Sequence, residues 1–139
     1  MAKVSIIDIE NAFDFVNFDN LSDNEAAVDR ETGEIYFWSS DLEEELPDDF
    51  DIESESLVLL PDKRDLDLGS KLAIDFAREF CPDDFEEIIA IFSHPGAYAH
   101  FKRLLERKNR LKEWYNFEQE KIRAALIDWC KTNEIELEK

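Results

Sequence analysis

The stretch Ala26-Ala27-Val28-Asp29-Arg30-Glu31-Thr32-Gly33-Glu34-Ile35-Tyr36-Phe37-Trp38 has the pattern of a β-hairpin. Gly33 can adopt the positive φ angle that a tight turn needs, and β-branched and aromatic residues dominate the arm that follows it. Further along, Ser56-Leu57-Val58-Leu59-Leu60 is a short apolar run that ends at Pro61. This run predicts a third strand beside the hairpin, and so a small antiparallel sheet.

Patterns typical of helices lie on both sides of this sheet. Ser5-Ile6-Ile7-Asp8 has the form of a capping box, and apolar residues then recur at helical spacing, which predicts a helix over residues 6–16. Apolar stripes downstream predict further helices over residues 68–80, from a capping box at 83–86, through Tyr98, Phe101 and Leu105, and from 111 to about 131. The fold class is therefore predicted to be α+β, with the small sheet packed on four to five helices.

The length of 139 residues fits a single domain, which should bury roughly two thirds of its unfolded surface. Within residues 1–139 we expect two parts. Residues 1–61 hold the first helix, the sheet and an acidic loop at 41–55, and residues 62–132 form a helical part. The acidic loop contains Pro47 and shows no regular period, which is typical of a loop or a frayed helix.

The composition indicates a folded protein inside the cell. Hydrophobic residues make up 44% of the chain, with 11 Phe and 3 Trp, unlike a disordered acidic tail. The first residues become charged too early for a signal peptide, and no apolar run approaches the roughly 18 residues that a membrane helix needs. Cys81 and Cys130 lack paired spacing, which is typical of reduced, buried thiols. We expect a cytoplasmic protein that does not enter a membrane.

The net charge of -19 is unevenly distributed along the chain. Residues 41–55 hold nine acids and no base, whereas residues 102–131 hold nine bases and five acids. A bipolar charge distribution can dock on itself or steer a partner. The overall charge argues against broad, nonspecific binding to nucleic acid, because the phosphate backbone would be repelled.

Short motifs occur along the chain in a characteristic order. They are Asp29-Arg30-Glu31-Thr32-Gly33-Glu34, Leu59-Leu60-Pro61, Gly96-Ala97-Tyr98, Phe101-Lys102, Trp114-Tyr115-Asn116-Phe117 and Trp129. In this order they resemble the bacterial group catalogued as uncharacterised protein family 0158, from about residue 6 to residue 130. The resemblance implies an intracellular bacterial domain and implies no particular reaction.

Residue patterns for catalysis or metal binding are weak in this sequence. His94 and His100 would have to converge with Glu79 or Glu86 to hold a metal, and their spacing matches no known ligand pattern. The acidic loop lacks the spaced oxygen ligands and the turn glycine of a calcium loop. Phosphate-cradling glycine loops and nucleophile motifs are not found either. We therefore predict no catalytic residue, no metal and no cofactor.

Two surfaces are candidates for binding a partner. The first joins acidic residues to aromatic anchors of the kind found at interface centres, in the set Glu43, Glu44, Glu45, Arg110, Trp114 and Phe117. A broad core stripe is the alternative interpretation of Trp114 and Phe117. The second candidate is a basic cluster that could contact an anion, formed by Lys102, Arg103, Arg107 and Lys108. Its alternative interpretation is a solvated face that balances the surplus of carboxylates.

Three function classes follow from these observations. The first is a non-catalytic acidic cytoplasmic domain that acts through protein–protein contacts, with a basic protein as its partner. The second is an anion- or RNA-binding module that uses the basic helix at residues 102–112, where aromatic neighbours would suit base stacking. The third is an unrecognised hydrolase. The absence of catalytic motifs and the strong acidity favour the first class.

Overall fold

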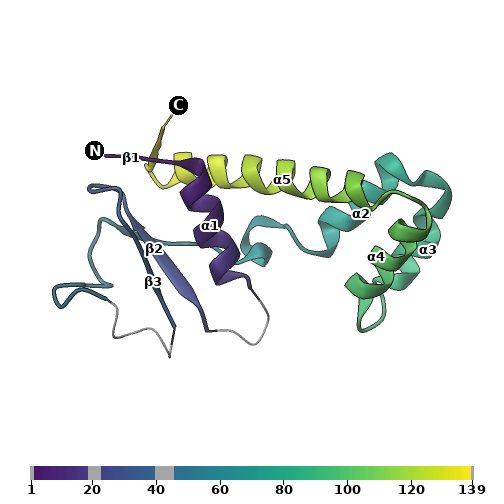
Figure 1. The fold of residues 1–139 in the computed structure, drawn as a ribbon, viewed down its shortest axis with the longest axis horizontal. Helices are drawn as coiled ribbons and strands as arrows, with labels where there is room; N and C mark the ends of the chain where they lie inside the picture. The colour runs from purple at the N-terminus through teal and green to yellow at the C-terminus, as the bar shows by residue number, and fades with distance from the viewer. Residues whose placement is uncertain (1, 19–22, 40–45, 139) are drawn as a thin grey trace. The chain divides into compact units, whose positions relative to one another are not determined.

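The computed structural model describes residues 2–18, 23–39 and 46–138. The chain forms two compact units (Figure 1), of which unit 1 comprises Met1–Leu66 and Arg123–Lys139, and unit 2 comprises Asp67–Ile122. The predicted division of the chain at residues 61 and 62 lies close to the end of the first segment of unit 1. That the C-terminal residues belong to unit 1 was not predicted. The single-domain organisation stays a prediction.

Unit 1 contains the predicted three-stranded sheet. Strands β2 (Glu25–Asp29), β3 (Ile35–Trp38) and β4 (Leu57–Leu59) are antiparallel, in the order β3-β2-β4. Helix α1 (Ile6–Val16) lies against β2 and β3 (Figure 1). There the ring of Phe15 meets that of Phe37 edge-on with 5.3 Å between centroids. The predicted sheet, first helix and α+β class are confirmed.

The turn of the hairpin has the predicted glycine geometry. Gly33 has a φ angle of +80°, in the left-handed region that favours glycine. Asp29 Oδ1 accepts hydrogen bonds from the backbone N–H groups of Glu31 and Thr32, at 2.9 and 3.3 Å. A Cβ atom at Gly33 would lie 3.1 Å from the Cβ of Ala2. The turn therefore packs closely on the chain's first residues.

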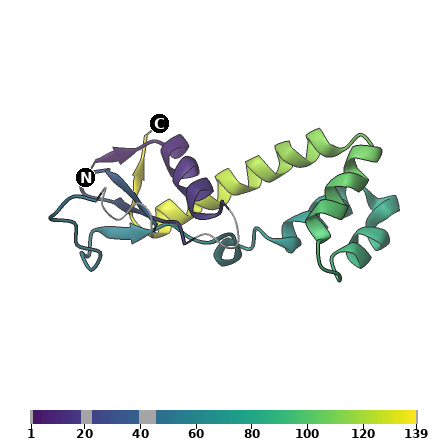
Figure 2. The same ribbon diagram turned by 60° about the horizontal axis from the view of Figure 1, so that its bottom comes forward.

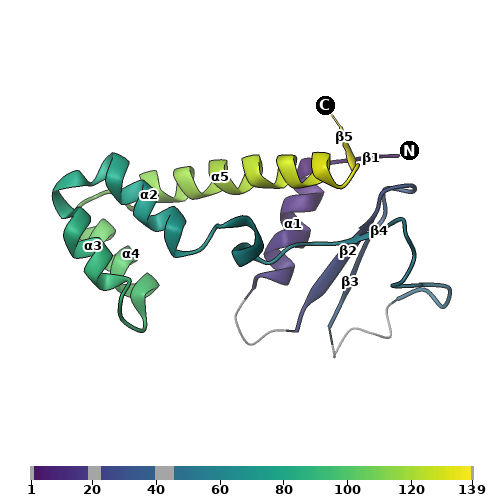
Figure 3. The same cartoon turned by 180° about the vertical axis from the view of Figure 1, so that it is seen from behind.

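A second, two-stranded sheet joins the two ends of the chain. Strands β1 (Lys3–Val4) and β5 (Glu136–Leu137) pair in parallel and lie side by side (Figures 2 and 3). The sequence did not predict this pair, because two residues are too few to show an alternating pattern.

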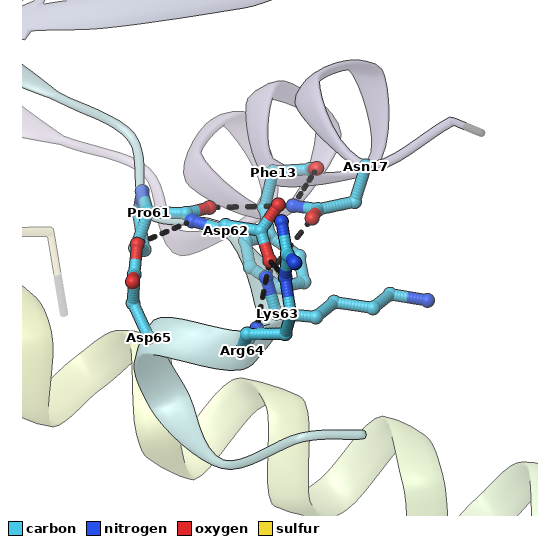
Figure 4. Close-up of polar contacts among 7 residues, drawn as sticks. All are labelled: Phe13, Asn17, Pro61, Asp62, Lys63, Arg64 and Asp65. Carbon is cyan, nitrogen blue, oxygen red and sulfur yellow. Dashed lines mark hydrogen bonds and ion pairs between the residues drawn. The ribbon is translucent and has the colours of Figure 1, made fainter. Parts of the chain in front are cut away.

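Polar side chains hold the loops of unit 1 in place. Asn17, at the C-terminus of α1, donates to the carbonyl oxygens of Phe13 and Pro61 at 2.9 and 3.3 Å (Figure 4). Its Oδ1 accepts from the backbone N–H of Lys63 at 3.0 Å. One amide thus ties the first helix to the chain that follows β4 and leads into the short helix η2 (Lys63–Leu66).

The described part of the acidic segment, residues 46–55, is anchored by one aromatic ring. Phe50 packs against Tyr36 and Trp38 of β3, with 5.1 and 5.4 Å between ring centroids. Asp48, Asp49 and Asp51 around it remain exposed. The segment is therefore a loop with an apolar anchor on the sheet.

Unit 2 is helical. It contains α2 (Ser70–Phe80), the 3₁₀ turn η3 (Pro82–Asp84), α3 (Phe85–Ile91), α4 (Ala97–Arg107) and the first part of α5 (Leu111–Thr132) (Figure 3). The predicted capping box at residues 83–86 does not form, because the chain makes the 3₁₀ turn there. Asp84 precedes α3 without a side-chain capping hydrogen bond, and Lys108 pairs with its carboxylate at 3.7 Å.

Packed aromatic rings form the core of unit 2. Phe76 lies at the centre of this cluster, with Phe101, Trp114 and Phe117 around it at centroid distances of 5.3 to 6.5 Å. Trp114 is fully buried, and its Nε1 is a buried donor that lacks a hydrogen-bond partner within the described ranges. Both cysteines are buried and free, as expected. The described helices include none that is long and apolar enough to span a membrane.

Candidate functional site

Helix α4 presents a basic face to solvent. The left-handed conformation of Gly96, with a φ angle of +73°, starts the helix directly after the turn. Phe101, Leu104 and Leu105 point into the core and are buried. The opposite side therefore faces outward and carries His100, Arg103 and Arg107, which are three and four residues apart and so share one face. We call these three residues the basic face of α4.

An open hollow lies against this face. It has a volume of about 580 Å³ and is lined by His100, Arg103, Glu106 and Arg107. Pockets that bind small molecules commonly have volumes of roughly 300–1,000 Å³. Two guanidinium groups, one imidazole and one carboxylate thus surround a space of ligand size.

The two arginines of the basic face make no ion pair with the residues that the structure describes. Arg103 donates Nε to the carbonyl of Ala99 at 3.3 Å, and among the described residues no carboxylate pairs with Arg103 or Arg107. Other bases of unit 2 do form ion pairs: Lys71 with Asp75, Lys108 with Asp84 and Arg110 with Glu113. In a chain with 35 acids, the basic face thus differs from these paired bases, and Lys102 beside it likewise has no ion pair among the described residues.

The four predicted anion contacts have different surroundings. Arg103 and Arg107 line the hollow. Lys102 is exposed beside it and places its ammonium group 5.8 Å from the ring centroid of Tyr115. Lys108 is tied to Asp84 by the ion pair. The structure thus brings two of the four to one site and gives the other two separate contacts.

The aromatic part of the predicted acidic–aromatic surface is buried in unit 2. Glu43, Glu44 and Glu45 lie outside the described residues. Trp114 and Phe117 would have to be accessible to anchor a partner, but they are 0% and 8% exposed. The core-stripe interpretation of these two rings is therefore the correct one, because α2 and α4 supply Phe76 and Phe101 to cover them. Arg110 is exposed and pairs with Glu113 at 2.8 Å.

His100 was weighed as a metal ligand and expected instead to be an exposed helix histidine, which is how it lies in α4, but its place on the basic face was missed. The signal was present in the sequence, because His100, Arg103 and Arg107 have the spacing of residues that share one helical face. His94 lies exposed in the turn before α4. In the ranges that the structure describes, no group of three or more His, Cys, Asp or Glu could hold a metal ion.

Burial makes the thiols of both cysteines less reactive. Burial raises the pKa of the Cys130 thiol to about 11, and burial also raises the pKa of Cys81. The thiolate is the nucleophilic form of cysteine, so a raised pKa disfavours attack at neutral pH. The cysteines fit the core role that the sequence predicted.

Comparison with known proteins gives one match. The profile described as Uncharacterised protein family (UPF0158) matches residues 4–138. No curated protein and no solved structure shows significant similarity to the chain. The match covers almost the whole chain, so the protein belongs to this family, as the ordered motifs indicated.

Proposed function

We propose that this member of UPF0158 is a non-catalytic binding protein of the bacterial cytoplasm, and that it holds a phosphate-bearing anionic partner on the basic face of α4. The observation that carries the proposal is the pair of exposed arginines, Arg103 and Arg107, beside a hollow of about 580 Å³. A guanidinium group presents a planar fork of N–H donors that matches the oxygens of a phosphate. The free, buried cysteines support a reducing compartment.

The distribution of charge between the units supports the same proposal. Unit 1 contains seven bases and 24 acids, whereas unit 2 contains nine bases and 11 acids. The net charges are therefore -17 and -2, so nearly all of the acidity belongs to unit 1. Within unit 2 itself the charges nearly balance, so the unit that carries the basic face adds little net negative charge against an anion.

A titration with short-chain inorganic polyphosphate tests the proposal. The variant Arg103→Gln/Arg107→Gln should bind about tenfold more weakly at low salt, because each exposed charge contact contributes up to about 1 kcal/mol. The matched control, Lys71→Gln/Lys121→Gln, removes the same charge from the same unit away from α4 and should bind as the parent does. Equal affinity of the two double variants would contradict the proposed site.

A second candidate function, contact with a basic protein, is supported by the anchored acidic segment. Phe50 fixes the loop on β3 and leaves Asp48, Asp49 and Asp51 exposed around it. Such a surface could steer a basic partner, and steering acts mainly on the association rate. Replacing these three aspartates by Asn should then slow association with a captured partner and flatten its salt dependence. An unchanged rate and salt profile would leave the segment as a solubilising loop.

A further inference from the structure

A pair of exposed tyrosines accompanies the basic face. Tyr98 on α4 and Tyr115 on α5 belong to unit 2 and are 39% and 46% exposed. Phe92 supports Tyr98 edge-on, with 5.4 Å between centroids, so the orientation of the ring is fixed by packing. Lys102, one turn after Tyr98, places its ammonium group 5.8 Å from the ring centroid of Tyr115.

These aromatic and basic groups occupy one continuous exposed arc of α4. With about 100° per residue, the order around the helix is Tyr98, Lys102, Glu106, Ala99, Arg103, Arg107 and His100. The side chains buried in the core, Phe101, Leu104 and Leu105, fill the remaining arc. A ligand that lies on α4 therefore meets an aromatic ring at one border of the surface and two guanidinium groups at the other.

The combination of exposed tyrosines and arginines favours some phosphate-bearing ligands over others. Inorganic polyphosphate offers no ring to stack on a tyrosine, and a nucleic-acid duplex keeps its base faces inside the helical stack. A single strand presents both its phosphates and its unstacked bases, and proteins that bind single strands combine basic grooves with aromatic platforms. Resting on the proposed function, we infer that the ligand of the basic face is a single-stranded nucleic acid whose bases stack on Tyr98 and Tyr115 while its phosphates bind Arg103 and Arg107.

The small number of arginines on the basic face determines how strongly we expect binding to depend on salt. Two phosphate contacts release few counterions, so the slope of log affinity against log salt should be shallow, about -1.4 for a single strand. Proteins that cover many phosphates have much steeper slopes. The strand should therefore bind weakly and locally, through a few nucleotides.

The test is fluorescence anisotropy of a short labelled oligonucleotide with the full chain. The ligands compared are single-stranded RNA, single-stranded DNA of the same sequence and an RNA duplex. Inorganic polyphosphate is tested as a separate ligand. Both single strands should bind, and the duplex should bind more weakly. Tyr98→Leu and Tyr115→Leu should each reduce affinity for the single strands by roughly tenfold, the typical effect of losing one stacked base. Neither should change affinity for polyphosphate.

Matched variants separate this inference from the proposed function. Tyr98→Phe and Tyr115→Phe retain the ring and should retain affinity, whereas Arg103→Gln/Arg107→Gln should weaken binding to single strands and to polyphosphate alike. If both Leu variants bind single strands as the parent does while the arginine variant binds weakly, stacking is wrong and the anion site stands. Equal binding of duplex and single strand would also overturn the inference. If the arginine variant keeps its affinity for polyphosphate, the proposed function itself fails.

Discussion

Two arginines of unit 1 and two arginines of α4 in unit 2 have different surroundings. In unit 1, Arg30 donates to the carbonyl oxygens of Asn133 and Glu55 at 3.2 and 2.6 Å and pairs with Glu134 at 3.9 Å. Arg123 of the same unit donates two hydrogen bonds to Glu10, at 3.2 and 2.7 Å. In unit 2, Arg103 and Arg107 line a hollow, and the described residues offer them no carboxylate partner.

This difference separates arginines that make contacts within the fold from arginines whose side chains are available to bind a ligand. Arg30 connects the hairpin turn to the end of α5 and to the acidic segment, so its side chain adds polar contacts to a unit whose apolar core includes Ile9 and Phe13. Unit 2 has the packed rings around Phe76 as its core, and the arginines of α4 are exposed outside that core, so we expect the fold not to need them. A residue's charge therefore does not indicate its role until its partners are known.

Trp114→Ala should cause the largest loss of stability, because it would break the aromatic core of unit 2. Replacing a buried tryptophan by alanine typically lowers the free energy of unfolding by about 3–5 kcal/mol. Urea denaturation monitored by circular dichroism measures this change. The control Trp114→Phe should lower stability less, because it keeps an aromatic ring and removes the unpartnered Nε1 donor. If Trp114→Ala left the urea midpoint unchanged, the ring would not be part of the core. The interpretation of Trp114 as a surface contact for a partner would then be the correct one.

Gly33→Val should cause the next largest loss of stability, and it tests how closely the hairpin turn of unit 1 is packed. A β-branched residue resists the φ angle of +80°, and its Cβ would lie 3.1 Å from that of Ala2. The expected loss is about 1–3 kcal/mol. Gly96→Val is the matched control in unit 2, because its φ angle is +73° but no atom lies within 4 Å of the added Cβ. Thermal melts should show a larger loss at Gly33, and equal losses would mean that contact with Ala2 is unimportant.

Cys130 gives the smallest expected effect, a pH dependence in unit 1. The thiol has a pKa of about 11 when folded, against 9.0 for an ordinary cysteine, so the folded state holds its proton more tightly. The resulting stabilisation is complete below pH 9 and is lost as the pH rises to 11. The chain should lose up to about 2 kcal/mol more stability across this range than Cys130→Ala does. Parallel stability curves for the two proteins would show that the thiol is not buried.

The sequence predicted the elements with strong local patterns. Gly33 fixed the hairpin turn, Pro61 ended the third strand, and apolar stripes that include Phe76, Phe101 and Leu126 predicted their helices. The parallel pair β1 and β5 was missed because its two-residue strands have no periodic pattern, and its partners are far apart in the sequence. The roles of charged residues depend on such distant partners as well. Arg30, for example, meets the carbonyl of Asn133, which no local pattern indicates.

The aromatic residues show why the candidate site was only half predicted. Trp114 and Phe117 were proposed as surface anchors from composition and helical position. Their burial depends on rings from α2 and α4, which the sequence of α5 alone does not contain. Arg103 and Arg107 were among the predicted anion contacts, but the bases of that cluster were expected to spread over the polar faces, with Arg107 at the connection between two helices. The structure continues α4 to Arg107, so helical spacing places the two arginines on one face, and tertiary packing decided which aromatic rings remained exposed.

The central claim, that the arginines of unit 1 stabilise and those of α4 bind, is tested most directly by one paired measurement. Thermal stability and polyphosphate affinity are measured together for Arg30→Gln and for Arg103→Gln/Arg107→Gln, with binding assayed below each melting temperature. We predict that Arg30→Gln melts at a lower temperature and binds polyphosphate as the parent does. The double variant should melt as the parent does and bind about tenfold more weakly. The reverse pattern, or a loss of affinity in Arg30→Gln equal to that of the double variant, would contradict the claim.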